Sequence, residues 1–493
     1  MKLIKNLKNT KTGLNEMPVK IFKLVSSYLL GPICYIINLS INSGIFPTTL
    51  KLARITPVFK KGTREDIANY RPISSLHFIS KIFERCITNR LISFFSKFQL
   101  FSRSQFGFLK NKSTTDALVD LTEHIYEALN DKKHHMSILI DLKKAFDTVN
   151  IPILVKKLDA YGVRGLPLVW IENFLKDRES FVSLGPIKSN KVITNIGLPQ
   201  GSIISPILFL IYINDLPDTA DNLHCTLFAD DTTFSVSHSD YDAMTDLLNE
   251  KLTKVSDWFL ANRLTINVSK TELILHTNRP HACSDRQIVL EGSNIQFSDS
   301  VVFLGTVIDE KLTFSNHIYQ VLNKISRSTG VLYKIRGQLP HVARVNFYNA
   351  LIYPYLAYSV VVWGSTNQVH LRPLEIQQKR IIRVIADAGF ADHTTPLFKK
   401  FNVLKLADIY KFFTILYTRK EILNGLFGPQ HSLNTRNRNL ARPTFHRLSR
   451  CQHSVSFSGP HLWNSLPLEI TETESLPSFK KKLKAHFLES YVS

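Results

Sequence analysis

Apolar and polar positions follow two different periods along this chain, and the two periods separate helical from extended stretches. Apolar residues that recur three and four positions apart predict amphipathic helices. Such stretches are residues 1–45, 76–98, 114–130, 151–178, 241–262 and 478–488, with mostly helical periodicity from about 311 to about 425. In residues 114–130 a Thr or Ser N-cap precedes the first apolar position, which strengthens the helix prediction there.

Shorter runs predict strands. Residues 51–60 alternate apolar and polar side chains, as a strand with one buried face does. Residues 135–141 and 223–229 are continuous apolar runs that end at acidic residues, a pattern typical of buried strands. Further strands are expected at residues 273–276 and 301–307, and an Arg-, Asn- and Ser-rich loop at residues 430–460.

Two longer apolar stretches are too short to span a bilayer. Residues 29–41 contain Pro32, and residues 350–363 contain Pro354. No apolar core follows the first lysines, so no signal peptide is indicated. We therefore expect no membrane partner and a protein that is not secreted, in the nucleus or the cytoplasm.

The charge is strongly positive and unevenly spread. The 493 residues carry 61 Lys and Arg against 40 Asp and Glu. Residues 1–113 hold 19 basic against 4 acidic residues, and residues 371–493 hold 19 against 9. The middle, with 23 against 27, is slightly acidic. Basic flanks suit a polyanionic partner such as nucleic acid, although a basic surface without that role is the alternative.

Cysteine and histidine usage indicates no disulfide framework and no zinc ribbon. The five cysteines are scattered and form no Cys-x-x-Cys pair. Four metal-ligating side chains near the C-terminus match no common zinc spacing; they are His446, Cys451, His453 and His461.

The main chemical signal is that two buried apolar runs end in aspartates. One run ends at Asp141, and the other precedes Asp230 and Asp231. An ionised carboxylate at such a place is costly unless a positive group meets it, and Mg²⁺ prefers carboxylate oxygens. Phosphoryl transfer commonly uses two metal ions roughly 3.5–4 Å apart. Two adjacent strands that each contribute an aspartate could build that site.

A purely structural interpretation exists for each aspartate. Asp141 could cap a helix that begins near Lys143. Asp230 and Asp231 could form a hairpin turn. Because both features occur together, with a glycine-containing turn near residue 199 between them, the metal-binding interpretation is favoured.

The order of seven motifs resembles the reverse transcriptases of non-LTR (LINE-type, jockey-like) retrotransposons, nearly end to end. The fingers segment of that family is similar to ARITPVFKKG followed by NYRPISSL, and its next block to QFGFLKNKSTTDAL. Its first palm motif is similar to DLKKAFDTVN, its Pro-Gln-Gly motif to GLPQGSIISPILFLIYINDLP, and its aromatic-x-Asp-Asp motif to LFADD. The later palm motifs are similar to LTINVSKTELILH and VFLGTVID, and a C-terminal segment to GPHLWNSLP and LPSFKKKLKAHF.

The departures from the family pattern are small. Leu198 stands where valine is commoner, and Ser205 where glycine is. Neither replaces a charged group. LFADD alone would be weak support, whereas seven motifs in the right order are specific.

The resemblance implies a catalytic set. Asp141 and Asp230 correspond to metal ligands, and the backbone carbonyl of Leu142 completes a coordination shell. Asp231 corresponds to a third carboxylate in catalysis or metal positioning. Lys270 corresponds to the lysine that protonates the departing pyrophosphate, with an ordinary surface lysine as the alternative.

The resemblance also implies a nucleotide-binding set. Phe146 matches the aromatic gate against a ribose 2′-OH, with a core phenylalanine as the alternative. Gln200 and Gly201 would line the nucleotide pocket, where glycine allows close backbone approach, or form a plain turn. Arg71 and Lys60 would contact the triphosphate, or be solvated surface charges.

The implied fold is α+β, a right-hand polymerase with an antiparallel palm sheet. We expect an N-terminal helical extension at residues 1–50, fingers and palm at 51–310, and a helical thumb and C-terminal region at 311–493. Residues 1–50 are too few for the endonuclease domain that full-length elements of this type encode.

The implied function is that of an RNA-directed DNA polymerase. A primer 3′-hydroxyl would attack the α-phosphate of a dNTP, with two Mg²⁺ ions (or Mn²⁺) as cofactors. The expected partners are an RNA template, a DNA primer and dNTPs. An inactive or maturase-like relative that binds RNA without polymerising is the alternative. A pure nucleic-acid-binding protein would explain the charge but not the strand-end aspartates.

Overall fold

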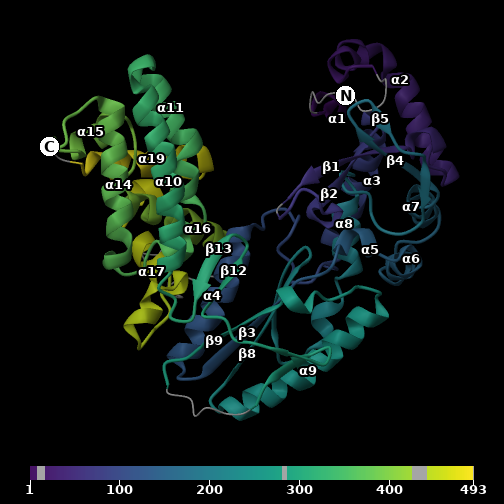
Figure 1. Cartoon of the computed structure of the whole chain (residues 1–493). Coiled ribbons are helices and arrows are strands. Elements are labelled where there is room, and N and C mark those ends of the chain that lie inside the picture. The colour runs from purple at the N-terminus through teal and green to yellow at the C-terminus, as the bar shows by residue number, and fades with distance from the viewer. Residues whose placement is uncertain (8–16, 61, 280–285, 425–440, 492–493) are drawn as a thin grey trace.

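The computed structural model of the chain describes all residues outside 8–16, 61, 280–285, 425–440 and 492–493. Its elements form a U in which a sheet and its helices make the base and two lobes rise on either side (Figure 1). The N-terminal lobe is purple to blue, and the C-terminal lobe is green to yellow. Helices and mainly antiparallel sheets occur together, so the expected α+β class is confirmed.

The base of the U is a four-stranded antiparallel sheet. Its order is β7 (His224–Phe228), β8 (Asp231–His238), β3 (His134–Ile140) and β9 (Glu272–His276). β3, β7 and β9 confirm the strands expected there, whereas β8 was not expected. Met136, Ile138 and Ile140 share a core with α9 (Tyr241–Ala261), whereas Leu139 packs with the core of α4 (Thr114–Asn130). Both faces of β3 are therefore covered, which explains its continuous apolar run.

The N-terminal lobe contains a second sheet. Its order is β2 (Tyr70–Leu76), β1 (Ala53–Phe59), β4 (Arg178–Leu184) and β5 (Ile187–Lys188), with β6 (Val192–Thr194) also paired to β4. β1 and β4 run parallel, with Ala53 opposite Ser180. The expected helix at residues 151–178 is wrong at its end, because Arg178 begins β4.

Helices surround these sheets in the N-terminal lobe and the base. They are α1 (Lys2–Lys5), α2 (Val19–Ser43), α3 (Phe78–Lys97), α5 (Ala145–Thr148), α6 (Ile151–Ala160), α7 (Leu166–Leu175) and α8 (Ser205–Tyr212). α6 and α7 are separate because Gly162 and Gly165 adopt φ of 92° and 65°, outside the helical range.

α2 corrects the expectation of a short apolar stretch at residues 29–41. The helix is 25 residues long, continues through Pro32 and ends at Ser43, and the C-cap residue Gly44 has a φ of 70°. Among the described helices, α2 alone is long and apolar enough to cross a membrane. One such helix near the N-terminus is weak evidence of a membrane span by itself. Val19, Phe22 and Ile37 of α2 are buried in the protein core, whereas Leu24, Tyr28 and Tyr35 are exposed.

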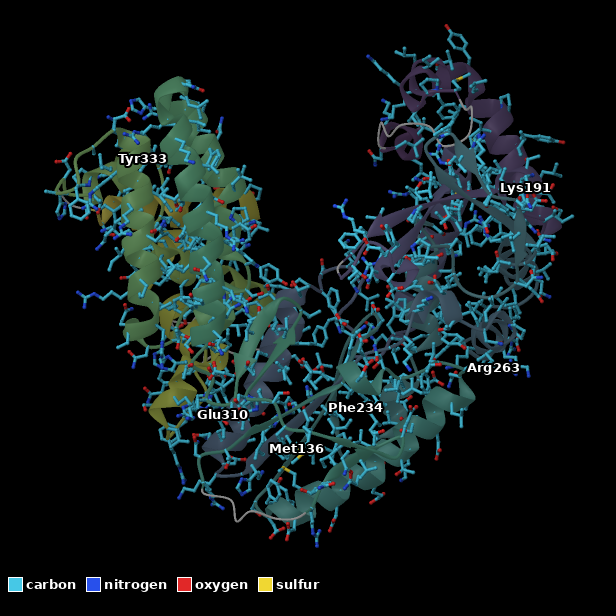
Figure 2. The ribbon with its side chains drawn as sticks, viewed as in Figure 1. Met136, Lys191, Phe234, Arg263, Glu310 and Tyr333 are labelled. Carbon is cyan, nitrogen blue, oxygen red and sulfur yellow. The ribbon has the colours of Figure 1, made fainter. Side chains whose placement is uncertain are left out.

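The C-terminal lobe is helical, as expected from residue 311 onward. It contains α10 (Ser315–Ile335), α11 (His341–Leu351), α12 (Tyr353–Ala357), α13 (Val360–Trp363), α14 (Gln368–Ala386), α15 (Thr395–Lys400), α16 (Leu406–Leu423), α17 (Val455–Asn464), α18 (Leu468–Thr471) and α19 (Leu476–Glu489). Side chains fill the interior of this lobe, which shares its core with α4 (Figure 2). The basic helix expected at residues 478–488 is α19.

Two further expectations need correction. The single strand expected at residues 301–307 is a hairpin of β12 (Ser300–Phe303) and β13 (Thr306–Asp309). The loop expected at residues 430–460 lies partly outside the described residues, and α17 already begins at Val455. A smaller hairpin, β10 (Ile288–Leu290) and β11 (Ser293–Ile295), contacts α9.

Candidate active site

Strand pairing brings the three aspartates to one edge of the four-stranded sheet at the base of the U, which is called the palm sheet from here on. β3 and β8 are neighbours, and Ile140 pairs with Thr232. The next residues outward, Asp141 and Asp231, therefore lie side by side. Asp230 lies in the turn between β7 and β8, so the hairpin-turn and metal-site interpretations of the LFADD segment are compatible.

Asp141 is not a helix cap. The helix after it, α5, begins only at Ala145, and its N-cap position is Lys144 without a side-chain hydrogen bond. The carboxylate of Asp141 instead accepts a hydrogen bond from Nδ2 of Asn267 at 2.7 Å, and its carbonyl accepts one from the Asn267 amide at 2.8 Å. Nζ of Lys270 lies 3.8 Å from Oδ2 of Asp141. Both partners lie in the segment between α9 and β9, so the motif around Lys270 holds Asp141 in place.

The site favours protonated carboxyl groups or a bound cation. Desolvation first, and then the nearby charge of Asp141, raise the pKa of Asp230, while Arg71 and Lys60 oppose this shift. Desolvation, Asp230 and Asp141 together raise the pKa of Asp231 to about 6. Like charges crowded at a strand edge have this effect, and a divalent cation would relieve it.

A cavity of about 1380 Å³ opens above these aspartates, between the palm and the N-terminal lobe. Nine of the ten candidate residues line it: Lys60, Arg71, Asp141, Leu142, Phe146, Gln200, Gly201, Asp230 and Lys270. Asp231 is not among the lining residues, although it adjoins Asp230 in sequence. Residues that are up to 210 positions apart in sequence thus meet at one cavity, as the motif order implied.

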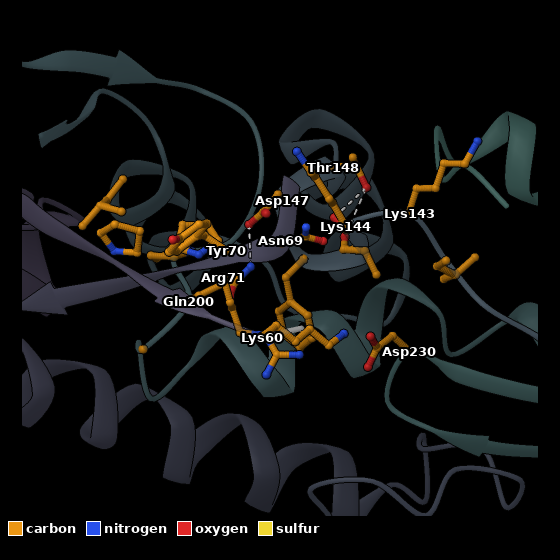
Figure 3. Close-up of a pocket in the computed structure, with 18 of the residues that line it drawn as sticks. Lys60, Asn69, Tyr70, Arg71, Lys143, Lys144, Asp147, Thr148, Gln200 and Asp230 are labelled. Carbon is orange, nitrogen blue, oxygen red and sulfur yellow. Dashed lines mark hydrogen bonds between the residues drawn. The ribbon is translucent and has the colours of Figure 1, made fainter. Parts of the chain in front are cut away.

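The basic side of the cavity comes from the β1–β2 hairpin. Lys60 and Arg71 project from it toward Asp230 and Gln200 (Figure 3). The hairpin is closed by a hydrogen bond from the Lys60 amide to the Asn69 carbonyl at 2.9 Å. Both side chains line the cavity, and each is close enough to lower the pKa of Asp230, which an isolated surface charge would not do.

Phe146 is one of the residues that line the cavity. Its ring stacks on Phe209 of α8, with the ring centroids 4.5 Å apart and the planes 20° apart. The side chain is only partly buried, so one part of it belongs to the core and another faces the cavity.

The turn at Gln200 and Gly201 lines the cavity and is hydrogen-bonded to Asp147 and to strand β2. Nε2 of Gln200 donates to Oδ1 of Asp147 at 2.8 Å, and the Gln200 carbonyl accepts from the Ser74 amide of β2 at 2.7 Å. Gly201 has a φ of 116°, and a Cβ there would lie 2.4 Å from the Ser74 carbonyl oxygen. The close approach that requires glycine is therefore made to β2.

The sequence reasoning missed Glu84, which anchors the same turn from beneath. Glu84 is fully buried in α3. Its carboxylate accepts hydrogen bonds from the hydroxyl groups of Ser80 and Ser202 and from the Ile203 amide, each at 2.6 Å. A buried acid within a helical pattern signals such a role, but its partner 118 residues away cannot be read from the pattern.

The donor set fits a hard divalent cation. The carbonyl oxygen of Leu142 is a further candidate oxygen ligand beside the aspartates. No hydrogen-bond donor in the described part of the chain reaches it, so this acceptor is available to a ligand. The described residues contain no ready-made group of three or more His, Cys, Asp or Glu side chains that could hold a metal, and this includes His446 and Cys451. Two carboxylates and a carbonyl are an oxygen-only set of the kind that Mg²⁺ accepts alongside substrate phosphates.

An acidic strand edge on an antiparallel palm, between a fingers-like sheet lobe and a helical lobe, defines a right-hand polymerase. Residues 58–308, half of the chain, match the family model described as "Reverse transcriptase (RNA-dependent DNA polymerase)". The chain therefore belongs to the reverse transcriptase family, in its non-LTR, jockey-like branch.

Individual relatives agree with this assignment. The chain is 30% identical over 399 residues to the RNA-directed DNA polymerase from mobile element jockey of Drosophila melanogaster, which covers 78% of this chain and 43% of that protein. It is 28% identical to the probable RNA-directed DNA polymerase from transposon BS of the same organism, covering 75% and 42%. The chain thus spans less than half the length of these curated relatives.

Similar solved structures are more distant. Telomerase from Candida albicans, in complex with a fragment of telomeric RNA, is 12% identical, with a TM-score of 0.40 over 73% of this chain and 68% of that one. Apo telomerase from Candida tropicalis is 14% identical, with a TM-score of 0.39 over 61% of each chain.

Proposed function

We propose that the chain is an RNA-directed DNA polymerase that extends a primer with dNTPs. The observation that carries the proposal is that strand-end carboxylates, Lys60 and Arg71, and Phe146 line one and the same cavity. A triphosphate needs positive charge at one end and a metal-bearing acidic edge at its α-phosphate. The cavity offers both.

Asp141, Asp230 and the Leu142 carbonyl are the proposed metal ligands. Two Mg²⁺ ions, when bound, would stabilise the charge on the attacking and leaving oxygens. Asp231 keeps the local field negative and helps to place them. Asn267 holds the Asp141 carboxylate through its 2.7 Å hydrogen bond, so the first ligand is oriented before any ion arrives.

The remaining cavity residues bind and select the nucleotide. Arg71 and Lys60 neutralise the triphosphate, Arg71 as a two-pronged donor and Lys60 as a point charge. Gln200 and Gly201 form the wall beside the nucleotide, and Phe146 excludes a 2′-OH. Lys270, with its side chain 56% exposed, is free to reach the departing pyrophosphate as a proton donor.

The lobes receive the nucleic acid in this proposal. Residues 51–310 form fingers and palm, residues 311–493 form the helical thumb and C-terminal region, and residues 1–50 are an N-terminal helical extension. The β4–β6 strands belong to the fingers sheet, because β4 pairs with β1. An RNA template annealed to a DNA primer would lie between the lobes, above the palm.

Primer extension tests the proposal. The purified chain, given a DNA primer on an RNA template with Mg²⁺ and four dNTPs, should extend the primer, and a chelator should stop extension. Binding to the same primed RNA is measured in parallel. Tight binding without any extension, in Mg²⁺ and in Mn²⁺, would contradict the proposal and favour the maturase-like alternative.

A further inference from the structure

The loop between α3 and α4 holds the turn that carries Asp230. Gln105 lies in this loop and is 1% exposed. Its Oε1 accepts a hydrogen bond from the Gly107 amide at 2.7 Å and another from the Ala229 amide at 3.1 Å. Ala229 immediately precedes Asp230, so one side-chain oxygen links the loop to the backbone next to the catalytic carboxylate.

Backbone contacts align the loop with strand β7. The Phe106 amide donates to the Leu227 carbonyl, and the Leu227 amide donates to the Ser104 carbonyl, both at 2.8 Å. Gly107 completes the contact, because a Cβ there would lie 2.6 Å from the Ala229 nitrogen. Only a glycine allows the loop to approach the turn this closely.

The turn needs such support. Ala229 adopts a φ of 56°, a left-handed conformation that a residue with a Cβ avoids in the absence of compensating contacts. Its amide is buried with the residue, and Gln105 is its acceptor in the described structure. Without that oxygen the amide would be left unpaired, and the turn would relax toward other conformations.

The acceptor oxygen is the part of Gln105 that the fold uses. In the described part of the chain, Nε2 of Gln105 has no hydrogen-bond partner, although it is buried. Lys112 fixes the loop from behind, where its Nζ donates to the carbonyls of Arg103 and Gln105 at 2.7 Å each and lies 4.4 Å from the centroid of the Phe106 ring. The oxygen is therefore presented to Ala229 from a braced loop.

We infer that Gln105 is a positioning residue for polymerisation: its carboxamide oxygen fixes the Ala229–Asp230 turn and thereby directs the Asp230 carboxylate toward the metal site beside Asp141. Gln105 touches no substrate, and it acts only through the turn. The role in polymerisation rests on the proposed function, but the effect of Gln105 on the Ala229–Asp230 turn can be tested without polymerisation.

The variant Gln105→Met tests the inference, because methionine keeps the side-chain volume and removes the acceptor. Gln378→Met is the matched control. Gln378 is 3% exposed in α14, and its amide bonds to the Tyr348 hydroxyl, the Leu404 carbonyl and the Leu406 amide, far from the palm. Both variants lose a buried amide, so both should melt at lower temperature.

Three measurements separate positioning from packing. The first is the affinity for Mn²⁺ of the protein bound to primed RNA, measured by electron paramagnetic resonance in the absence of nucleotide. This affinity should fall about tenfold in Gln105→Met and stay unchanged in Gln378→Met, because Gln105 supports a metal ligand from outside the coordination shell. Deuterium exchange at the Ala229 amide should accelerate in Gln105→Met alone. Single-turnover extension below both melting temperatures should slow in Gln105→Met, with the KM for dNTP within about twofold of wild type.

Gly107→Ala gives a second, independent test, since its new methyl group forces the loop off the turn. It should reproduce weaker Mn²⁺ binding and faster Ala229 exchange. Wild-type Mn²⁺ affinity in folded Gln105→Met and Gly107→Ala proteins would overturn the inference, as would losses that only follow the unfolded fraction. If the wild type itself does not polymerise, the proposed function fails, whereas the Mn²⁺ and exchange results still decide the role of Gln105.

Discussion

Replacing Phe146 with Val should relax the choice between deoxyribose and ribose. The ring lines the cavity beside Gln200 and is supported from below by Phe209, 4.5 Å away. Valine removes the outer part of the ring and leaves the turn after Asp141 intact. In the proposed binding mode, in which Lys60 and Arg71 contact the triphosphate, the space that opens would be next to the sugar.

The size of the effect follows from what the ring excludes. A 2′-OH adds an atom about as large as a methylene, and rejecting one such group in a tight pocket is worth about 1–3 kcal/mol, or roughly 10–200-fold. The ratio of catalytic efficiencies for dNTP and NTP should fall by that factor. Because Phe146 is only partly buried, the stability cost should be about 1–2 kcal/mol, below the value for a fully buried ring.

The assay compares incorporation of one dNTP and its matching NTP on the same primed RNA template. Phe94→Val is the control, since Phe94 is also partly buried against another ring, Phe98, with centroids 5.0 Å apart, and does not line the cavity. Both variants should lose similar stability, and only Phe146→Val should change the ratio. Parallel loss of both activities in Phe146→Val, with an unchanged ratio, would show that the residue is part of the core and not the gate.

Three further predictions concern the rest of the site. The pKa of Asp231 is raised to about 6 in the folded protein, so the folded state binds more protons than the unfolded state between about pH 4 and 6. The protein, freed of metal by a chelator, should therefore lose stability as pH rises through this window, by about 1 kcal/mol given the exposure of Asp231. Asp231→Asn should remove most of this pH dependence of the denaturation midpoint. Glu84→Gln should cost about 3 kcal/mol, because a buried amide cannot accept from all three donors that Glu84 satisfies; urea unfolding measures this, and a wild-type midpoint would contradict the anchoring role. Affinity for primed RNA should fall steeply between 50 and 200 mM salt, roughly 10³-fold or more if six phosphates are contacted; a nearly flat salt dependence would refute the electrostatic account of the basic flanks.

Local pattern predicted three of the four strands of the palm sheet and its helix α4, because these elements are recognisable within short windows, but it missed β8. Residues 114–130 carry an apolar stripe and directly follow the N-cap Ser113, and α4 has those bounds. The apolar runs that end at Asp141 and Asp230 predicted two strands, β3 and β7, and both lie in one sheet, where each pairs with β8. The family resemblance then identified nine residues that line one cavity.

Features that depend on distant partners could not be predicted in this way. β4 was missed because its pairing with β1 joins Ala53 to Ser180, and no turn signal marks so distant a neighbour. The β12–β13 hairpin turns at Leu304 and Gly305, with φ of 46° and 80°; it was missed although Gly305 favours such a turn, because leucine at the other turn position does not.

Two residues that support the catalytic aspartates could not be predicted, for the same reason. Asn267 and Gln105 are ordinary polar residues in the sequence, and their partners lie 126 and 124 residues away. Their roles become visible only when the palm strands are assembled around them.

Single-turnover incorporation of one dNTP on a primed RNA template, measured for wild type, Asp230→Asn and Asp257→Asn, tests the central claim most directly. Asp257 is an exposed residue of α9 outside the cavity, so its variant makes the same change in charge and volume elsewhere. The account predicts extension by wild type and Asp257→Asn, and a loss of more than about 100-fold in a folded Asp230→Asn protein. Extension by folded Asp230→Asn at the rate of Asp257→Asn would contradict the assignment of Asp230 to the catalytic centre.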